Sequence, residues 1–535
     1  MAKKLLAMIL AIVMIVTLLA ACGGSGNSST GGGNQSQAGG GNSSVADKED
    51  SKTDDVSTPA DSDEEPYNVV MEYMYYGELS PDFEEIEQAI SERAKELINC
   101  TVTFVPVGLF DADTTMNMML SGGEQLDLMI AMGGTGFQNA VNRNQVIELD
   151  DLYAQYGKGI EETMGLAVMG GYLNGKLYAI PSLDKFGREY GLIGNVEYMD
   201  KYELATRNHP TYEQLDEWFA RVKEGEGEAF YPFILSGSTS TTYNYFHSYD
   251  ALGSADASGV ILQEHIDDPT IVDLFETEEY KEHLKWMHKW YEEGYINPDA
   301  LTTSETTQSH IQNNKGAVYT IFVEMDMLPQ QQGQFDTYGQ TVDRILLVDK
   351  FTTQGNLNSQ NWMVTVNSEN PEKAFQFLNL LYEDDEIINL LYWGIEGKHY
   401  VKTDKNMTVA YPDGVDGTNV GYQQPLGLYG AVAKRYIMGN AYPDDYFEQL
   451  AEFDDIHEGD PDVSPYLGYS FNTEPYKTEF AAVNDVISQY RYSLEVGAVD
   501  PEEVLPQFID ALKAAGIDTI IEANQQSLNE WLASK

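Results

Sequence analysis

From about residue 66 onward, short apolar runs alternate with amphipathic stretches. Residues 68–76 have the pattern of a strand, and Ser80 precedes a helix whose apolar residues follow helical spacing: Phe83, Ile86, Ile90, Ala94 and Leu97. The pattern then predicts a strand over 101–107, a helix over 114–120 and a strand over 127–131. Strands that alternate with helices predict βαβ units and a largely parallel sheet.

Signals for helix boundaries predict three long helices later in the chain. Each begins with a residue whose side chain can cap the free N–H groups of the first turn. The helices begin at Thr277, Asn370 and Asp500, and the first and third end at Gly294 and Gly516.

The first 65 residues have a different character from the rest of the chain. Lys3 and Lys4 precede an apolar run that is too short to span a bilayer, so residues 1–21 are expected to be an export signal peptide. The small residues before Cys22 resemble the lipobox of bacterial lipoproteins, which implies an acylated Cys22 thiol. The alternative is an ordinary signal peptide with an incidental cysteine. Residues 22–65, rich in Gly, Ser and acidic residues, predict a disordered tether.

Composition narrows the classes of partner. Among 535 residues, 86 acidic and 31 basic side chains give a formal net charge of -55, which disfavours nucleic acid and electrostatic docking to anionic lipid. If Cys22 is acylated, Cys100 is the one remaining thiol, and no internal disulfide can form. We expect Cys100 to be a small buried residue.

Several short segments occur in a set order along residues 66–535. They are SGGEQLDL at 121–128, GKLYAIP at 175–181, WYEEGYINP at 290–298, NSENPEKAF at 367–375, GIEGKHY at 394–400 and LKAAGID at 512–518. The first four resemble segments of family 1 extracellular solute-binding proteins of ABC importers. The last two are similar to a Gram-positive subgroup, the LipO-type lipoproteins with an added C-terminal domain of unknown function.

That resemblance implies an α/β fold of the periplasmic-binding-protein-like type 2 class, a two-lobe clamshell with hinge crossings. By position, lobe one comprises residues 66–182 plus 357–402. Lobe two comprises residues 183–356 plus 403–535, including the family-specific C-terminal region. The part after His399 is longer than in simple sugar binders of this family.

The chain lacks the common catalytic signatures, including the nucleophile elbow, the phosphate-binding loop and the His-Glu-x-x-His zinc helix. We therefore expect no enzyme activity, no cofactor and no metal. A surface glycosidase stays an alternative because its two carboxylates need no sequence motif.

Aromatic residues suit a sugar site, since sugar rings combine an apolar C–H face with a rim of hydroxyl groups. We expect stacking platforms from Tyr75, Tyr76, Tyr178, Tyr243, Tyr245, Trp362 and Trp393. Polar contacts are expected from Glu78, Arg188, Asn244, Asn361 and Glu396, and free backbone N–H groups from the turn formed by Gly133, Gly134, Thr135 and Gly136. Trp362 is favoured because it follows a Gly-Asn-rich segment taken for a hinge crossing, although burial in the core is the alternative for each aromatic residue.

The resemblance implies a monomeric receptor, lipid-anchored at the extracellular face of the cell membrane, that delivers an oligosaccharide or related polar solute to ABC permease subunits. Binding would shift the population toward a closed form. The net charge favours a neutral or cationic solute. A peptide receptor of an ABC importer is the alternative within binding proteins.

Overall fold

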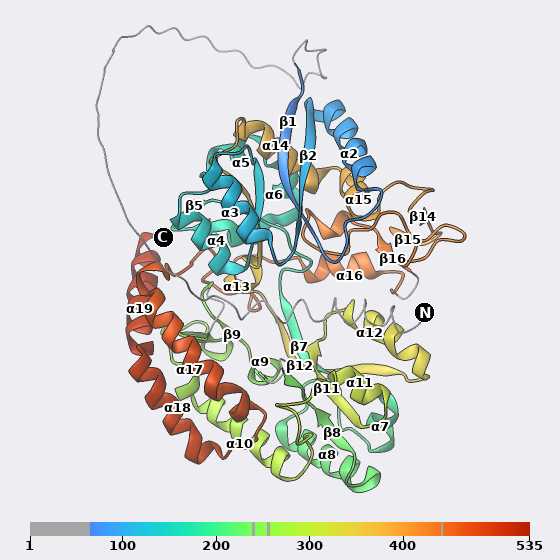
Figure 1. The fold of residues 1–535 in the computed structure, drawn as a ribbon. Coiled ribbons are helices and arrows are strands. Elements are labelled where there is room, and N and C mark those ends of the chain that lie inside the picture. Colours follow the sequence, from blue (N-terminus) through green and yellow to red (C-terminus); the bar gives the residue numbers. More distant parts are fainter. Residues whose placement is uncertain (1–64, 238–240, 254–256, 440–441) are drawn as a thin grey trace. The chain divides into compact units, whose positions relative to one another are not determined.

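The structure is a computed structural model that describes residues 65–237, 241–253, 257–439 and 442–535. The predicted signal peptide, Cys22 and the tether up to residue 64 lie outside the described residues. Two sheets organise the rest of the chain (Figure 1). The first sheet packs in one hydrophobic core, and the second sheet contributes side chains to two others.

The first sheet has the strand order β2-β1-β3-β13-β6. Three parallel strands alternate with two helices, as the sequence predicted: β1 (Tyr67–Tyr75), α2 (Phe83–Ile98), β2 (Cys100–Gly108), α3 (Ala112–Gly122) and β3 (Leu128–Met132). The sheet is completed by two short strands, β6 (Ile180–Pro181) and β13 (Gln360–Val364). Strand β13 pairs antiparallel with both β3 and β6, and all five strands lie within the residues predicted for lobe one.

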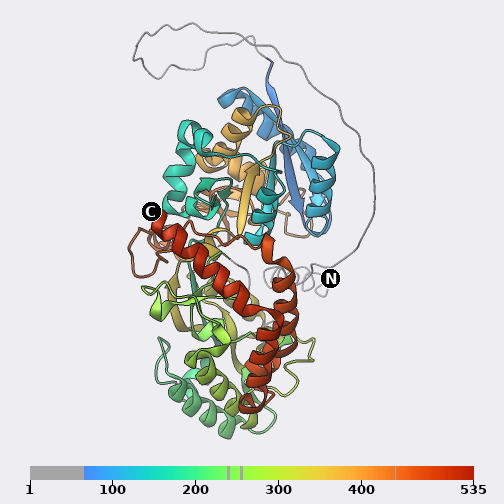
Figure 2. The same cartoon turned by 90° about the vertical axis from the view of Figure 1, so that its left-hand side faces the viewer.

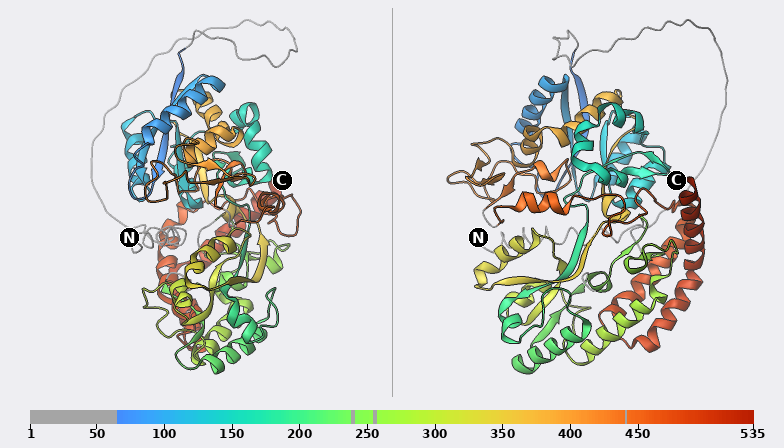
Figure 3. Two further views of the ribbon diagram at one scale, coloured as in Figure 1. Left: turned by 90° about the vertical axis from the view of Figure 1, so that its right-hand side faces the viewer. Right: turned by 180° about the vertical axis from the view of Figure 1, so that it is seen from behind.

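The second sheet has the strand order β12-β7-β11-β8 and lies within the residues predicted for lobe two. Its strands are β7 (Arg188–Asn195), β8 (Tyr231–Ile234), β11 (Gly316–Phe322) and β12 (Val342–Phe351). Strands β7 and β12 pair antiparallel and lie side by side in Figures 1 and 3. The chain enters this sheet from β6 at β7 and returns from β12 to β13, so two crossing segments join the sheets.

The capped helices form where the sequence predicted them. They are α10 (Glu278–Glu292), α14 (Pro371–Glu383) and α18 (Pro501–Ala515). Thr277, Asn370 and Asp500 each accept a hydrogen bond from a backbone N–H of the first turn, and Gly516 ends α18 with a φ of 103°. Side-chain capping of this kind supplies partners that the first turn of a helix otherwise lacks.

Other helices cover the sheets or follow them in the chain. They are α4 (Gly133–Asn142), α5 (Asp150–Tyr156), α6 (Lys158–Met164), α7 (Val196–Lys201), α8 (Tyr212–Glu226), α9 (Tyr243–Phe246), α11 (Thr307–Gln312), α12 (Met327–Phe335), α13 (Gln354–Leu357), α15 (Asp385–Trp393) and α16 (Tyr446–Phe453). The chain ends in α17 (Lys477–Glu495), α18 and α19 (Ile517–Ser534), drawn in red in Figure 2. These three helices share a hydrophobic core with α10.

The segment that includes Tyr422 and Tyr429 packs in the core of the first sheet. The Tyr429 hydroxyl accepts a hydrogen bond from the Met74 N–H at 2.9 Å, and the Tyr422 hydroxyl lies 3.1 Å from that of Tyr73. The position of residues 403–535 in the sequence predicts that they belong to lobe two, whereas the stretch with Tyr422 and Tyr429 contacts the strands of lobe one. The exact division into lobes remains a prediction.

Cys100 is fully buried, as predicted, and burial raises the pKa of its thiol to about 11.

Glu72 lies at the centre of β1 with its side chain fully buried. One carboxylate oxygen accepts a hydrogen bond from the Ile130 N–H at 2.9 Å, and the other has no hydrogen-bond partner among the described residues. Burial disfavours the charged form and raises the pKa of Glu72 from 4.5 to about 8. The folded protein therefore holds this proton at a pH where the unfolded chain releases it.

We predict that this carboxyl group makes the free energy of unfolding fall as the pH rises from about 4.5 to about 8, since the folded state binds the extra proton. Glu72→Gln should remove that part of the pH dependence, measured by urea unfolding at pH 5 and pH 8. Glu84→Gln, at an exposed position of α2, serves as the control. Equal pH slopes for the wild type and Glu72→Gln would contradict the prediction.

Candidate functional site

The chain crosses between the two sheets at one edge of each sheet, and we call these the facing edges. On the second sheet, Arg188 begins β7 and pairs with Phe351, the last residue of β12. On the first sheet, Gln360 begins β13 and pairs with Met132, the last residue of β3. Because β1 runs parallel to β3, its last residue, Tyr75, lies at the same edge. Strand ends of this kind are where α/β proteins commonly bind solutes.

Three aromatic side chains meet at the facing edge of the second sheet, and we call them the aromatic cluster. They are Tyr190 of β7, Phe322 of β11 and Tyr245 of α9, with ring centroids 5.4 to 6.3 Å apart. Tyr190 and Phe322 are paired across the two strands, and all three side chains are partly buried. The cluster combines apolar ring surface with two phenolic hydroxyl groups.

A charged pair borders the aromatic cluster. The Arg188 guanidinium carbon lies 5.4 Å from the centroid of the Phe322 ring, and Arg188 Nη1 lies 3.5 Å from Glu324 Oε1. The Arg188 side chain is 29% exposed, whereas that of Glu324 is 1% exposed. Burial raises the pKa of Glu324, and attraction to Arg188 opposes the rise. The guanidinium group is thus the accessible member of the pair.

The two tyrosine hydroxyls of the cluster are neutral and available. Burial raises the pKa of Tyr190, and it raises the pKa of Tyr245 to about 12, so both groups stay protonated at neutral pH. Neither hydroxyl is hydrogen-bonded to another residue that the structure describes. Each can therefore both donate to and accept from a polar solute.

Predicted residues also lie at the facing edge of the first sheet. Tyr75 and Tyr76 are partly buried at the end of β1, and Glu78 is exposed in the loop that follows. The Tyr76 ring meets that of Phe110 edge-on at 6.3 Å, and Phe110 is 76% exposed. The loops after β1 and β2 therefore present ring surface at this edge.

The glycine-rich segment is a helix start rather than the expected turn. Helix α4 begins at Gly133, directly after β3, and includes Gly134 and Thr135. The Gly133 N–H donates to the Ser359 carbonyl at 2.7 Å, so it is not free for a solute. A Cβ atom at Gly134 would come within 2.5 Å of the Gly253 carbonyl oxygen. This glycine therefore permits the close approach of two backbone segments.

Trp362 and Asn361 lie inside the first sheet and do not reach the facing edges as exposed groups. Both side chains are fully buried, because β13 lies between β3 and β6 and is covered on both faces. The Trp362 indole N–H donates to the Leu428 carbonyl at 2.6 Å, and the Asn361 amide donates to the Asn358 carbonyl at 2.6 Å. The interpretation of Trp362 as a stacking platform does not fit this placement.

The structure also separates Tyr243 and Asn244 in role. The Tyr243 side chain is fully buried and its ring stacks on His247 at 4.8 Å, so it presents no face to a solute. Asn244 is partly buried, and its side-chain oxygen accepts a hydrogen bond from Arg491 Nη2 at 3.3 Å.

Three more predicted residues lie away from the strand ends that form the facing edges. The Tyr178 hydroxyl donates to Glu148 at 3.3 Å. At the end of α15, the Trp393 indole N–H donates to the Tyr436 carbonyl at 2.8 Å. The exposed Glu396 pairs with Lys402 at 3.1 Å. The structure therefore does not bring Tyr178, Trp393 and Glu396 together with the aromatic cluster.

Tyr190, Phe322 and Glu324 were not among the residues predicted for the site. A signal was present, because Arg188 and Tyr190 alternate at the start of the strand that follows the first crossing. Phe322 and Glu324 carry no local signal, since only the antiparallel pairing of β11 with β7 brings them to Arg188 and Tyr190.

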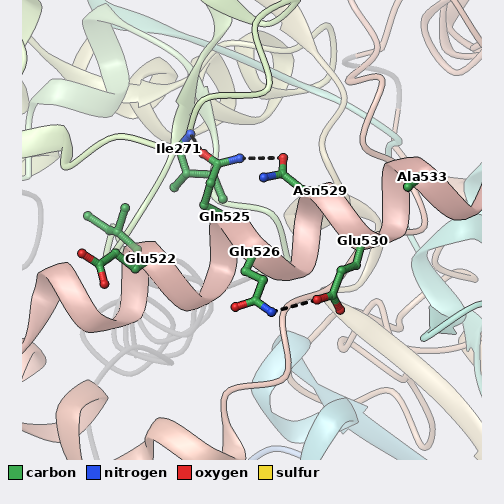
Figure 4. Close-up of a pocket in the computed structure, with 8 residues that line it drawn as sticks. Ile271, Glu522, Gln525, Gln526, Asn529, Glu530 and Ala533 are labelled. Carbon is green, nitrogen blue, oxygen red and sulfur yellow. Dashed lines mark hydrogen bonds between the residues drawn. The ribbon is translucent and has the colours of Figure 1, made fainter.

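A surface pocket of about 570 Å³ lies on α19 and is shown in Figure 4. Its lining is Ile271, Ile521, Glu522, Gln525, Gln526, Asn529, Glu530 and Ala533. The polar side chains mostly bond to one another or to backbone: Gln525 accepts from the Ile271 N–H at 2.7 Å, and Gln526 donates to Glu530 at 2.9 Å. We assign no solute to it, because these groups already satisfy each other.

The described part of the chain shows neither a cluster of metal-ligating side chains nor a helix that could span a membrane. No group of three or more His, Cys, Asp and Glu side chains in the described part of the chain is placed to hold a metal ion. Within residues 65–535, leaving out the three short gaps, every helix is too short or too polar to cross a membrane.

Comparison with known proteins places the chain in a family. The family described as bacterial extracellular solute-binding protein matches residues 77–387, and a domain of unknown function (DUF3502) matches residues 465–533. A carbohydrate ABC transporter substrate-binding protein of Streptococcus pneumoniae is 25% identical over 489 residues, which cover 89% of this chain and 93% of that protein.

Solved structures share the fold. The N-glycan transport solute binding protein (NgtS) of Streptococcus pneumoniae is 23% identical with a TM-score of 0.71, covering 87% of this chain and 99% of that chain. A solute-binding protein of Bifidobacterium longum infantis described as HMO-binding is 13% identical with a TM-score of 0.63, again covering 87% and 99%. The predicted two-lobe α/β fold is confirmed. The matched family consists of solute-binding transport proteins, in agreement with the prediction that the chain is not an enzyme. The chain belongs to the family of bacterial extracellular solute-binding proteins.

Proposed function

We propose that this chain is the receptor of an ABC importer and that it captures an oligosaccharide between its facing edges. The observation that carries the proposal is the aromatic cluster of Tyr190, Tyr245 and Phe322, bordered by Arg188. Ring faces match the apolar C–H face of a sugar, and neutral hydroxyls match its rim. NgtS structures hold Man5GlcNAc and Man1GlcNAc, which supports a glycan as the solute class.

The proposed binding site is formed by both facing edges together. Tyr75, Tyr76 and Glu78 would contact the solute from the first sheet, while Arg188 and the aromatic cluster would contact it from the second. A solute that bridges both edges binds best when they are close, so it shifts the population toward a closed form. The permease subunits would recognise that closed form, and the solute would be passed on without covalent change.

The charge of the chain bears on the kind of sugar. A formal net charge of -55 repels anionic solutes at long range, which favours a neutral glycan. Arg188 is an accessible cation at the facing edge, but it lies beside Glu324. We therefore propose a neutral oligosaccharide, with Arg188 donating hydrogen bonds to hydroxyl groups.

We predict that Tyr190→Ala and Tyr245→Ala each weaken binding of Man5GlcNAc by roughly tenfold, because each removes ring surface and a hydroxyl. Isothermal titration calorimetry against Man5GlcNAc, a fructan oligosaccharide and a mixed oligopeptide pool would measure the effect. Tyr338→Ala is the matched control, since Tyr338 is 44% exposed in the turn after α12. Wild-type binding of peptides but of no glycan would favour the peptide receptor.

We predict that Trp362→Phe lowers the free energy of unfolding by about 1–3 kcal/mol, because it leaves the buried Leu428 carbonyl without its partner. Glycan affinity should stay unchanged in this variant. A large loss of glycan affinity without loss of stability would contradict this prediction and would indicate that Trp362 contacts the solute.

We also propose that the Cys22 thiol carries the lipid that anchors the chain at the extracellular face of the membrane. The support is the sequence alone: an apolar run, small residues and Cys22, followed by a polar tether. In a Gram-positive host, Cys22→Ala should move the chain from the membrane fraction to the medium. Mass spectrometry of the N-terminal peptide would contradict the proposal if Cys22 of the processed wild-type chain were unmodified.

A further inference from the structure

Helix α9 carries Tyr245 of the aromatic cluster and consists of only four residues, Tyr243–Phe246. A helix of one turn cannot hold its own conformation in water, because nucleation costs more than its few hydrogen bonds return. The position of Tyr245 therefore depends on the contacts that other segments of the chain make with α9.

Two residues of α17 hold this helix directly. A carboxylate oxygen of Glu495 accepts a hydrogen bond from the Tyr243 N–H at 3.0 Å, and the Glu495 carbonyl accepts one from the Thr242 hydroxyl at 2.8 Å. Arg491, one turn earlier in α17, donates from Nη2 to the side-chain oxygen of Asn244 at 3.3 Å. Residues 242, 243 and 244 in succession are thus tied to α17.

Arg491 and Glu495 also form an ion pair with each other. Arg491 Nε lies 2.6 Å from Glu495 Oε1, and the Tyr280 hydroxyl of α10 donates to the same oxygen at 3.2 Å. The Glu495 side chain is fully buried and that of Arg491 is 11% exposed. A buried ion pair whose remaining groups are hydrogen-bonded has a strongly fixed geometry, and removing one partner leaves an uncompensated charge.

His283 of α10 supports α9 through Thr242. The Thr242 hydroxyl gives its one proton to the Glu495 carbonyl, so it must accept from His283 Nε2, which lies 2.8 Å away. Nδ1 of the same ring then accepts from the Tyr212 hydroxyl at 2.8 Å. Burial lowers the pKa of His283 well below its usual value, which agrees with this neutral ring.

We infer that Arg491 and Glu495 are positioning residues that hold α9, and with it Tyr245, at the facing edge of the second sheet. Both residues lie in the stretch 465–533 that matches a domain of unknown function, outside the stretch 77–387 that matches the solute-binding family. The C-terminal helices thus act on the site through α9. The effect on binding rests on the proposed function, whereas the effect on α9 does not.

Arg491→Lys keeps a cation beside Glu495 but is too short to reach Asn244 with the same geometry. We expect faster amide hydrogen exchange at residues 242–247 of the solute-free protein, with exchange in the two sheets unchanged. We also expect Man5GlcNAc affinity to fall on the order of tenfold, about the effect of losing one hydrogen bond to a charged group. Glu495→Gln should act in the same direction.

Lys513→Gln is the matched control, because it breaks an ion pair of the same C-terminal stretch, with Glu276, that does not contact α9. In a Tyr245→Ala background, Arg491→Lys should cause no further loss of affinity. Unchanged exchange at residues 242–247 in both α17 variants would overturn the inference, as would fully additive losses of affinity. Failure of the wild type to bind any glycan would instead overturn the proposed function and leave the exchange result as the test of positioning.

Discussion

The antiparallel pairing of β7 with β12 is the constraint on which the site depends. These strands carry the chain into and out of the second sheet, and their register sets Arg188 opposite Phe351 at the point of crossing. Strand β11 also pairs with β7, and the register of that second pair brings Phe322 beside Tyr190. The ends of β3 and β13 meet at the corresponding edge of the first sheet. The backbone pairing thus decides which side chains can meet a solute that lies between the sheets.

The chemistry at this edge suits a neutral, hydroxyl-rich solute in a strongly acidic protein. The groups at this edge are mainly ring faces and phenols that stay protonated, and the accessible cation beside them already has an anionic neighbour. Such a site needs no net charge on the solute, which fits a chain with a formal net charge of -55. The buried polar network of α17 then fixes the one cluster residue that does not come from a strand.

Local patterns in the sequence were enough to predict the first three strands, the two helices between them and three later capped helices, in their order. Helical spacing from Phe83, the caps at Thr277 and Asp500, and the alternation of strands and helices predicted what the structure contains, because these signals act within a few residues. Tyr75 and Tyr76 were found as candidates because the end of their strand can be read from the sequence.

Contacts between segments that are far apart in the sequence could not be predicted from such local patterns. Trp362 follows a crossing segment in the sequence, but β13 enters the middle of a sheet and buries its indole. Gly133 begins a helix, and its N–H is used by Ser359, more than 200 residues later in the chain. Tyr422 and Tyr429 pack in the core of lobe one, although their position in the sequence predicts lobe two. In each case the deciding contact is made by a distant segment that no local pattern identifies.

Small-angle scattering during a titration with Man5GlcNAc, with binding verified by calorimetry on the same sample, tests the central claim most directly. If a glycan bridges the two facing edges, the radius of gyration should fall as the sites fill and should level off at saturation. An unchanged radius of gyration at verified saturation would contradict the account, because the solute would then bind without drawing the two edges together.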